Sequence, residues 1–146
     1  MKVLIISPGK AHDNTVAEGV AEYQKRFKKF DVNWLFPSAG DKATEATAIL
    51  KAIKDGDYAV LLDERGKDID TPAVARLLDT HLQQGTKRVV FVIGGAFGVS
   101  EEVQARANAT YKLSSLVFPH MLARLILIEQ LYRAQSILDG GKYHHA

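Results

Sequence analysis

The chain has 146 residues, of which 47% are hydrophobic and 25% are charged, a balance typical of an ordinary globular protein. It contains no cysteine, which excludes both a disulfide framework and a thiolate metal site. The formal net charge of +2 is only a weak indication of anionic partners such as nucleic acid.

Apolar runs in the chain are too short for a secretory signal or a membrane span. Lys2 is followed by four apolar residues before Ser7, and Pro8-Gly9 then breaks the run. The apolar segment 121–128 is interrupted by Arg124. Since no linker or repeat divides the chain either, we expect one domain over residues 1–146, located in the cytoplasm without membrane contact.

The first half of the chain alternates strand and helix patterns. Apolar residues at spacings of three and four predict the first helix, and Pro37 and Asp55-Gly56 close the second strand and the second helix. The elements expected in this half are a strand at 3–6, a helix at 15–30, a strand at 32–36, a helix at 44–53, and a strand at 58–62 with an exit loop at 63–66.

The second half continues the alternation. Thr71-Pro72 is a typical helix start, and 88–93 is almost wholly apolar, as in strands buried on both faces of a parallel sheet. The elements expected in this half are a helix at 71–84, a strand at 88–93, a short helix from residue 100, a strand at 111–116 and a long helix at 119–138.

This order predicts an α/β fold: a mostly parallel sheet flanked by helices on both faces. Ligands of such sheets bind beyond the carboxyl ends of the strands. Three segments are therefore candidates for a binding site: the loop after Leu62, the glycine loop from Gly94, and residues 113–120.

The last helix is apolar around nearly its whole circumference, from Met121 to Leu131. A helix with that pattern must be buried on all sides. The pattern favours a second subunit as its cover, although a central position within one subunit would also bury it.

The loop Gly94-Gly95-x-x-Gly98 follows a buried strand and precedes a helix. Its spacing matches neither the dinucleotide fingerprint nor the phosphate loop, so a ligand cradle and a tight structural turn are both open. The acidic segment Asp63-Glu64-Arg65 is equally open: it could bring a carboxylate to a ligand or form a solvated turn with a local ion pair.

Two further features could serve chemistry or RNA binding. His144 in the tail could act as a general base near neutral pH, or belong to a disordered terminus. Metal binding is not expected, because no His, Asp or Glu cluster has ligand spacing and His144 and His145 are adjacent. The basic residues of segment 25–29 are expected on one face of the first helix, where they could meet phosphate or simply be solvated.

Several motifs together resemble one family. These are Leu61-Leu62-Asp63-Glu64-Arg65-Gly66-Lys67, Phe91-Val92-Ile93-Gly94-Gly95, Leu113-Ser114 with Phe118-Pro119-His120 and Arg124, Ile128-Glu129-Gln130-Leu131-Tyr132-Arg133-Ala134, and Tyr143-His144. In this order they are similar to the bacterial large-subunit ribosomal RNA pseudouridine N3-methyltransferases, small members of the SPOUT trefoil-knot methyltransferases.

The resemblance implies a C-terminal trefoil knot, a homodimer, and S-adenosylmethionine bound in a bent form, with no metal. It implies methylation of N3 of a pseudouridine in large-subunit (23S) ribosomal RNA, within the ribosome or large subunit. A non-enzymatic module that binds S-adenosylmethionine or RNA is the alternative. His144 is the expected catalytic base, and Tyr143 is expected to orient the target nucleobase or to hold the tail. The cofactor-binding residues carried over from the family are Leu62, Gly94, Leu113, Ser114, Ser115, Leu116, Val117 and Phe118.

Overall fold

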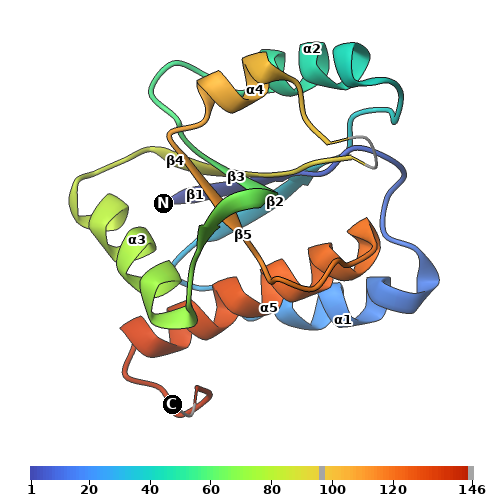
Figure 1. Ribbon diagram of the computed structural model, residues 1–146. Helices are drawn as coiled ribbons and strands as arrows, with labels where there is room; N and C mark the ends of the chain where they lie inside the picture. Colours follow the sequence, from blue (N-terminus) through green and yellow to red (C-terminus); the bar gives the residue numbers. More distant parts are fainter. Residues whose placement is uncertain (96–97, 145–146) are drawn as a thin grey trace.

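The computed structural model describes residues 1–95 and 98–144. It contains a five-stranded sheet in the order β2-β1-β4-β3-β5, and all four pairings between neighbouring strands are parallel (Figure 1). The predicted α/β class with a parallel sheet is confirmed. The strands are β1 (Lys2–Ile6), β2 (Asp31–Leu35), β3 (Tyr58–Asp68), β4 (Arg88–Ile93) and β5 (Ala109–Lys112).

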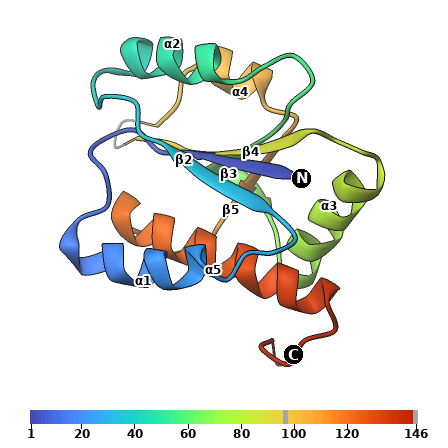
Figure 2. The same cartoon turned by 180° about the vertical axis from the view of Figure 1, so that it is seen from behind.

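Helices cover both faces of this sheet. On one face lie α2 and α4, and on the other α1, α3 and α5, an arrangement that the view from behind also shows (Figure 2). Each helix except α5 begins with a side-chain cap, in which an Asp or Ser oxygen accepts a backbone N–H three residues on. The helices are α1 (Asn14–Gln24), α2 (Lys42–Ala52), α3 (Thr71–Gln83), α4 (Glu101–Arg106) and α5 (His120–Leu138).

The hydrophobic core lies in two layers, one on each face of the sheet, and the central strand β4 contributes side chains to both. Val89 and Phe91 face the layer with α3 and α5, whereas Val90 and Val92 face the layer with α2 and α4. The near-continuous apolar run of β4 is therefore explained by burial on both faces. No helix in the described part of the chain is both long enough and apolar enough to cross a membrane.

The first helix is shorter than the sequence predicts. It ends at Gln24 rather than residue 30, because the backbone N–H groups of Lys28 and Lys29 donate to the Gln135 side chain at 3.0 and 2.9 Å instead of continuing the helix. The basic segment 25–29 thus lies beyond α1, and the prediction of one helical face for it is wrong. Lys25 pairs with Glu22, and Lys29 pairs with Asp139.

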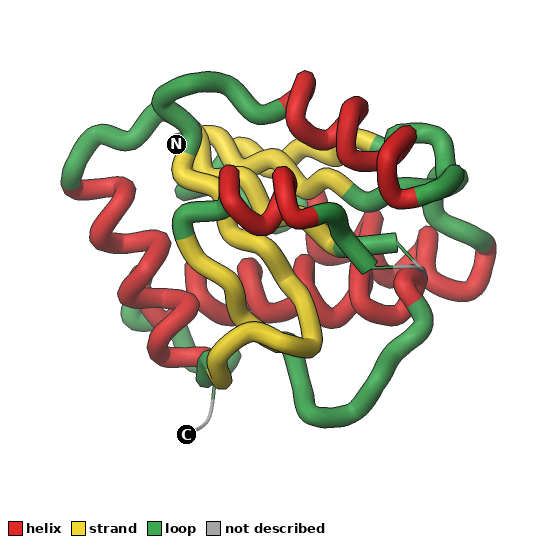
Figure 3. The backbone as a smooth tube through the Cα atoms, turned by 45° about the horizontal axis from the view of Figure 1, so that its top comes forward, coloured by secondary structure: helices red, strands yellow, loops and turns green. Residues whose placement is uncertain are grey.

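Strand β3 is longer than predicted and β5 begins earlier. Residues 63–66 are not an exit loop: β3 continues to Asp68 and pairs again with β5 beyond an irregularity between Leu62 and Lys67. A Cβ at Gly66 would lie 2.6 Å from the Tyr111 carbonyl carbon, so only glycine permits this close approach. Strand β5 ends at Lys112, and residues 113–119 form the loop to α5, one of the loops coloured green in Figure 3.

Helix α5 packs mainly within its own subunit. Leu127, Ile128 and Leu131 are buried, and the Leu125 side chain lies against Gly19 of α1. Leu122 is nevertheless 40% exposed, so burial on all sides is not reached in the described chain. The central packing that the sequence left open accounts for most of the apolar surface, and the dimer remains a prediction.

Candidate functional site

A cleft of about 920 Å³ lies at the carboxyl end of β4, beside the irregular part of β3 after Leu62 and the loop that follows β5. The parallel order β4-β3-β5 places these three segments side by side. All eight residues predicted to bind the cofactor line this cleft: Leu62, Gly94, Leu113, Ser114, Ser115, Leu116, Val117 and Phe118. The three segments chosen from the sequence therefore meet in one place.

The loop 113–119 leaves apolar side chains in the open. Leu116 is 72% exposed and Val117 is 82% exposed, and both line the cleft. Ser114 folds the loop locally, since its Oγ accepts the Leu116 N–H at 2.9 Å. Exposed apolar residues at a cleft are a common sign of a ligand or partner surface.

The glycine loop forms another wall of the cleft. Gly98 donates its N–H to the Gly95 carbonyl at 3.0 Å and has a φ of 79°, which favours glycine. A Cβ at Gly94 would lie 3.2 Å from Val99 Cγ1, so space is tight there as well. The loop is thus both a tight turn and a cleft wall; its residues 96 and 97 lie outside the described part of the chain.

Charged side chains line the rim beyond Leu62. Arg65 donates to both Asp63 oxygens, at 2.9 and 3.0 Å, and these hydrogen bonds hold the pKa of Asp63 below its usual range. Lys112 pairs with Asp68 at 3.3 Å. Segment 63–65 therefore contains the local ion pair that the sequence suggested, and it also lies at the cleft.

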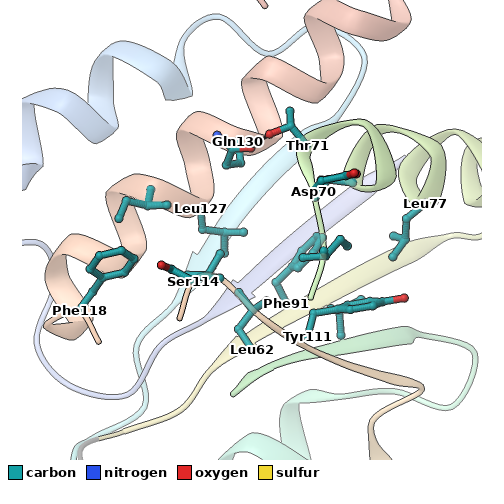
Figure 4. Close-up of a pocket in the computed structure, with 15 residues that line it drawn as sticks. Leu62, Asp70, Thr71, Leu77, Phe91, Tyr111, Ser114, Phe118, Leu127 and Gln130 are labelled. Atoms are coloured by element: carbon teal, nitrogen blue, oxygen red, sulfur yellow. Dashed lines mark hydrogen bonds between the residues drawn. The ribbon is translucent and has the colours of Figure 1, made fainter. Parts of the chain in front are cut away.

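A second, more apolar cavity of about 340 Å³ adjoins the cleft beneath β3 and β5, between α3 and α5. The two cavities share Leu62, Leu113, Ser114 and Phe118. Figure 4 shows Thr71 and Gln130 meeting at its far side, where Thr71 Oγ1 donates to Gln130 Oε1 at 2.6 Å. Sequence reasoning missed this cavity, because its lining residues read simply as the apolar faces of their elements.

Arg124 is fully buried, one helical turn after His120, which lines the cleft. Its guanidinium donates to Ser7 Oγ at 2.7 Å and to the Lys10 carbonyl at 2.8 Å, with longer contacts to the Ser7 and Pro8 carbonyls. A buried charge requires such satisfaction. Arg124 therefore ties the loop after β1 to the start of α5.

The tail residues Tyr143 and His144 lie away from the cleft. The Tyr143 hydroxyl donates to Glu129 Oε1 at 3.2 Å and lies 3.1 Å from the Tyr23 hydroxyl, which must then be the donor of that pair. Arg133 lies 4.8 Å from the centre of the Tyr143 ring and 3.2 Å from His144 Nδ1. Neither tail residue is among the described residues that line the two cavities.

Burial, the Tyr23 hydrogen bond and the Glu129 charge together raise the pKa of Tyr143. The neutral phenol, the ordinary form of tyrosine at physiological pH, is thus further favoured and acts as a hydrogen-bond donor. Sequence reasoning did not anticipate this tail cluster, defined as Tyr23, Glu129, Tyr132, Arg133, Tyr143 and His144. The spacing of Glu129 and Arg133, four residues apart on one helix, is the signal that could have indicated it.

The described residues contain no group of three or more His, Asp or Glu side chains arranged to hold a metal ion. An all-parallel sheet flanked by helices, with a cleft of this size beside the carboxyl end of a central strand, is typical of α/β proteins that bind ligands there. The family model described as a predicted SPOUT methyltransferase matches residues 1–144. The chain belongs to the SPOUT methyltransferase family.

Curated relatives match over nearly their full length. One from Geotalea daltonii is 36% identical over 153 residues, covering 99% of this chain and 100% of the relative. Another, from Parabacteroides distasonis, is 37% identical and covers 99% of both chains, and a third, from Parasynechococcus marenigrum, is 39% identical and covers 97% and 95%. All three are named ribosomal RNA large subunit methyltransferase H.

Proposed function

We propose that this protein is an S-adenosylmethionine-dependent methyltransferase that methylates N3 of a pseudouridine in large-subunit (23S) ribosomal RNA. The observation that carries the proposal is the convergence of Leu62, Gly94 and residues 113–118 on one cleft. Full-length relatives named as large-subunit ribosomal RNA methyltransferases support the same substrate class.

The cleft fits the methyl donor in size and in chemistry. Its volume of about 920 Å³ lies within the range of roughly 300–1,000 Å³ that is usual for ligand pockets. Leu62 and Phe118 offer apolar surface to an adenine ring, and Gly94 lets the backbone approach a ligand closely. When bound, S-adenosylmethionine supplies an electrophilic methyl group on its sulfonium sulfur.

The chain itself must orient the target base and accept a proton. The N3 imide nitrogen is a poor nucleophile until its proton leaves, so transfer forms a nitrogen–carbon bond, breaks the carbon–sulfur bond and delivers the N3 proton to a base. We assign the role of proton acceptor to His144. Tyr143 would orient the target nucleobase or hold the tail in place. Both residues lie in the tail cluster, away from the cleft of their own chain. For this role, either the tail must move out of the tail cluster to reach that cleft, or His144 must lie beside the cleft of a second copy of the protein.

The assembly proposed for this activity is a homodimer of one SPOUT domain, residues 1–146, with a trefoil knot in the C-terminal chain. Exposed apolar residues Leu116, Val117 and Leu122 near the start of α5 support a protein partner on that side. The RNA partner is the ribosome or large subunit, and the location is the cytoplasm.

The proposal is tested by mass spectrometry of 23S ribosomal RNA nucleosides from a strain that lacks this protein. The methylated pseudouridine should be absent, and it should form when purified protein and S-adenosylmethionine are added to the ribosomes. Tight binding of S-adenosylmethionine by calorimetry without methyl transfer would instead favour the non-enzymatic module.

A further inference from the structure

Glu45 is a buried carboxylate in the first turn of α2, only 7% exposed. It does not serve as the cap of its helix, since Asp41 accepts the Thr44 N–H at 2.8 Å. Instead its Oε2 accepts the Gly40 N–H at 2.9 Å. Burying a carboxylate costs free energy unless its oxygens are hydrogen-bonded or paired. The surroundings of Oε1, the other oxygen of Glu45, therefore matter.

The Glu45 side chain lies directly against Gly95 of the glycine loop. A Cβ built at Gly95 would overlap Glu45 Oε1 and lie 3.1 Å from Cδ. Gly95 does not have a positive φ, unlike Gly98, so its backbone conformation does not demand glycine. A side chain at Gly95 would meet only the end of the Glu45 side chain, so the carboxylate, and not the backbone, would have to move.

We infer that Glu45 is a positioning residue, which holds Gly95, at the start of the glycine loop, in the conformation that binds S-adenosylmethionine. The inference rests on the proposed function. Glu45 is not among the described residues that line the cleft, whereas Gly94 and Gly95 are. Its carboxylate accepts the Gly40 N–H before α2 and lies against Gly95 after β4, so its effect on the ligand passes through Gly95.

A double-mutant cycle tests the inference, with calorimetric affinity for S-adenosylmethionine as the readout. Gly95→Ala alone should weaken binding by about fivefold, because the added methyl group displaces the Glu45 carboxylate from its place beside Gly40 and Gly95. Glu45→Ala should also weaken binding, by about fivefold, since a freed loop must be ordered by the ligand. In the double variant, Gly95→Ala should add little, because the colliding carboxylate is gone.

Two variants separate positioning from general stability. Glu45→Gln keeps the shape and an oxygen acceptor for Gly40, and should retain near-native affinity. Gly94→Ala is the matched control, because its Cβ meets Val99 rather than Glu45, so its effect should be the same with or without Glu45. Thermal unfolding of each unliganded variant reports whether it is folded; should Glu45→Ala not fold, Glu45→Asp replaces it in the cycle.

Strictly additive effects of the two substitutions, or a Glu45→Ala protein with native affinity, would overturn the inference while leaving the proposed function intact. Absence of S-adenosylmethionine binding by the native protein would remove the proposed function and, with it, this role of Glu45. Coupling confined to Gly95, with near-native binding by Glu45→Gln, is the result expected.

Discussion

The cleft and the tail cluster carry the two halves of the proposed chemistry, and they are held together differently. The cleft is made by the loops after β4 and β5 and by the irregular part of β3, and its position follows from the order β4-β3-β5. The tail cluster is made by side-chain hydrogen bonds of Tyr143 and His144 to α1 and α5. The cleft is positioned by the sheet and persists as long as the protein is folded. The few part-buried hydrogen bonds of the tail can be replaced by hydrogen bonds to water at a small cost in free energy, so the tail can detach while the fold remains.

Arg124 fixes the start of α5, next to the cleft, to the loop after β1. Its substitution should change the measured property more than any other variant proposed below. Arg124→Met should lower the free energy of unfolding by about 3 kcal/mol or more, because Ser7 Oγ and the Lys10 carbonyl lose their buried donor. Urea unfolding measures this, with Ser7→Ala as a milder control. A loss below about 1 kcal/mol would mean that water replaces the guanidinium.

His144 tests the chemical role of the tail. His144→Ala should lower methyl transfer to ribosomes by about a hundredfold or more, the usual contribution of a general base. Affinity for S-adenosylmethionine should not change, since His144 does not line the described cleft. His81→Ala, on α3, is the matched control. Native turnover by the His144 variant would remove it from the mechanism.

Phe118 tests the wall shared by the cleft and the apolar cavity. Phe118→Ala should weaken S-adenosylmethionine binding about tenfold, because the ligand then buries less apolar surface. Its effect on unfolding should be small, because the side chain is only half-buried in the unliganded protein. Leu35→Ala, an exposed apolar residue outside both cavities, should leave binding unchanged.

Tyr143 tests how firmly the tail is docked. Tyr143→Phe removes the hydrogen bonds to Glu129 and Tyr23 and keeps the ring, so it should weaken docking by about 1 kcal/mol. Hydrogen exchange of residues 139–144 should rise, and exchange in β4 should stay slow. Equal protection of the tail in both proteins would show that ring packing, not the hydroxyl, holds it.

The basic segment after α1 should matter least. Lys25 and Lys29 already pair with Glu22 and Asp139. The two carboxylates offset the positive charge of the lysines and so weaken their attraction for RNA phosphates. Lys25→Glu with Lys29→Glu should reduce the salt dependence of ribosome binding by about one unit of slope for each phosphate that the protein no longer neutralises. Lys51→Glu with Lys54→Glu, at the end of α2, is the control, and identical slopes for the two pairs would exclude segment 25–29 from RNA binding.

Much of the fold was predictable because apolar periodicity and helix caps are local. The core strand β4 and the start of α3 at Thr71 were predicted correctly. The end of α1 was not, because Gln135, more than a hundred residues away, takes the backbone N–H groups of Lys28 and Lys29. The extension of β3 through Asp68 was missed for the same reason, since a β5 pairing partner decides it.

The amino-acid sequence by itself determined the α/β class, the parallel sheet and the three segments that line the cleft, because alternating strands and helices permit few topologies and place strand ends together. Only the tertiary structure decided where Tyr143 and His144 dock, which polar groups Arg124 satisfies, and that the Glu45 carboxylate lies against Gly95. Each of these depends on contacts between residues far apart in the chain, and no local pattern encodes such contacts.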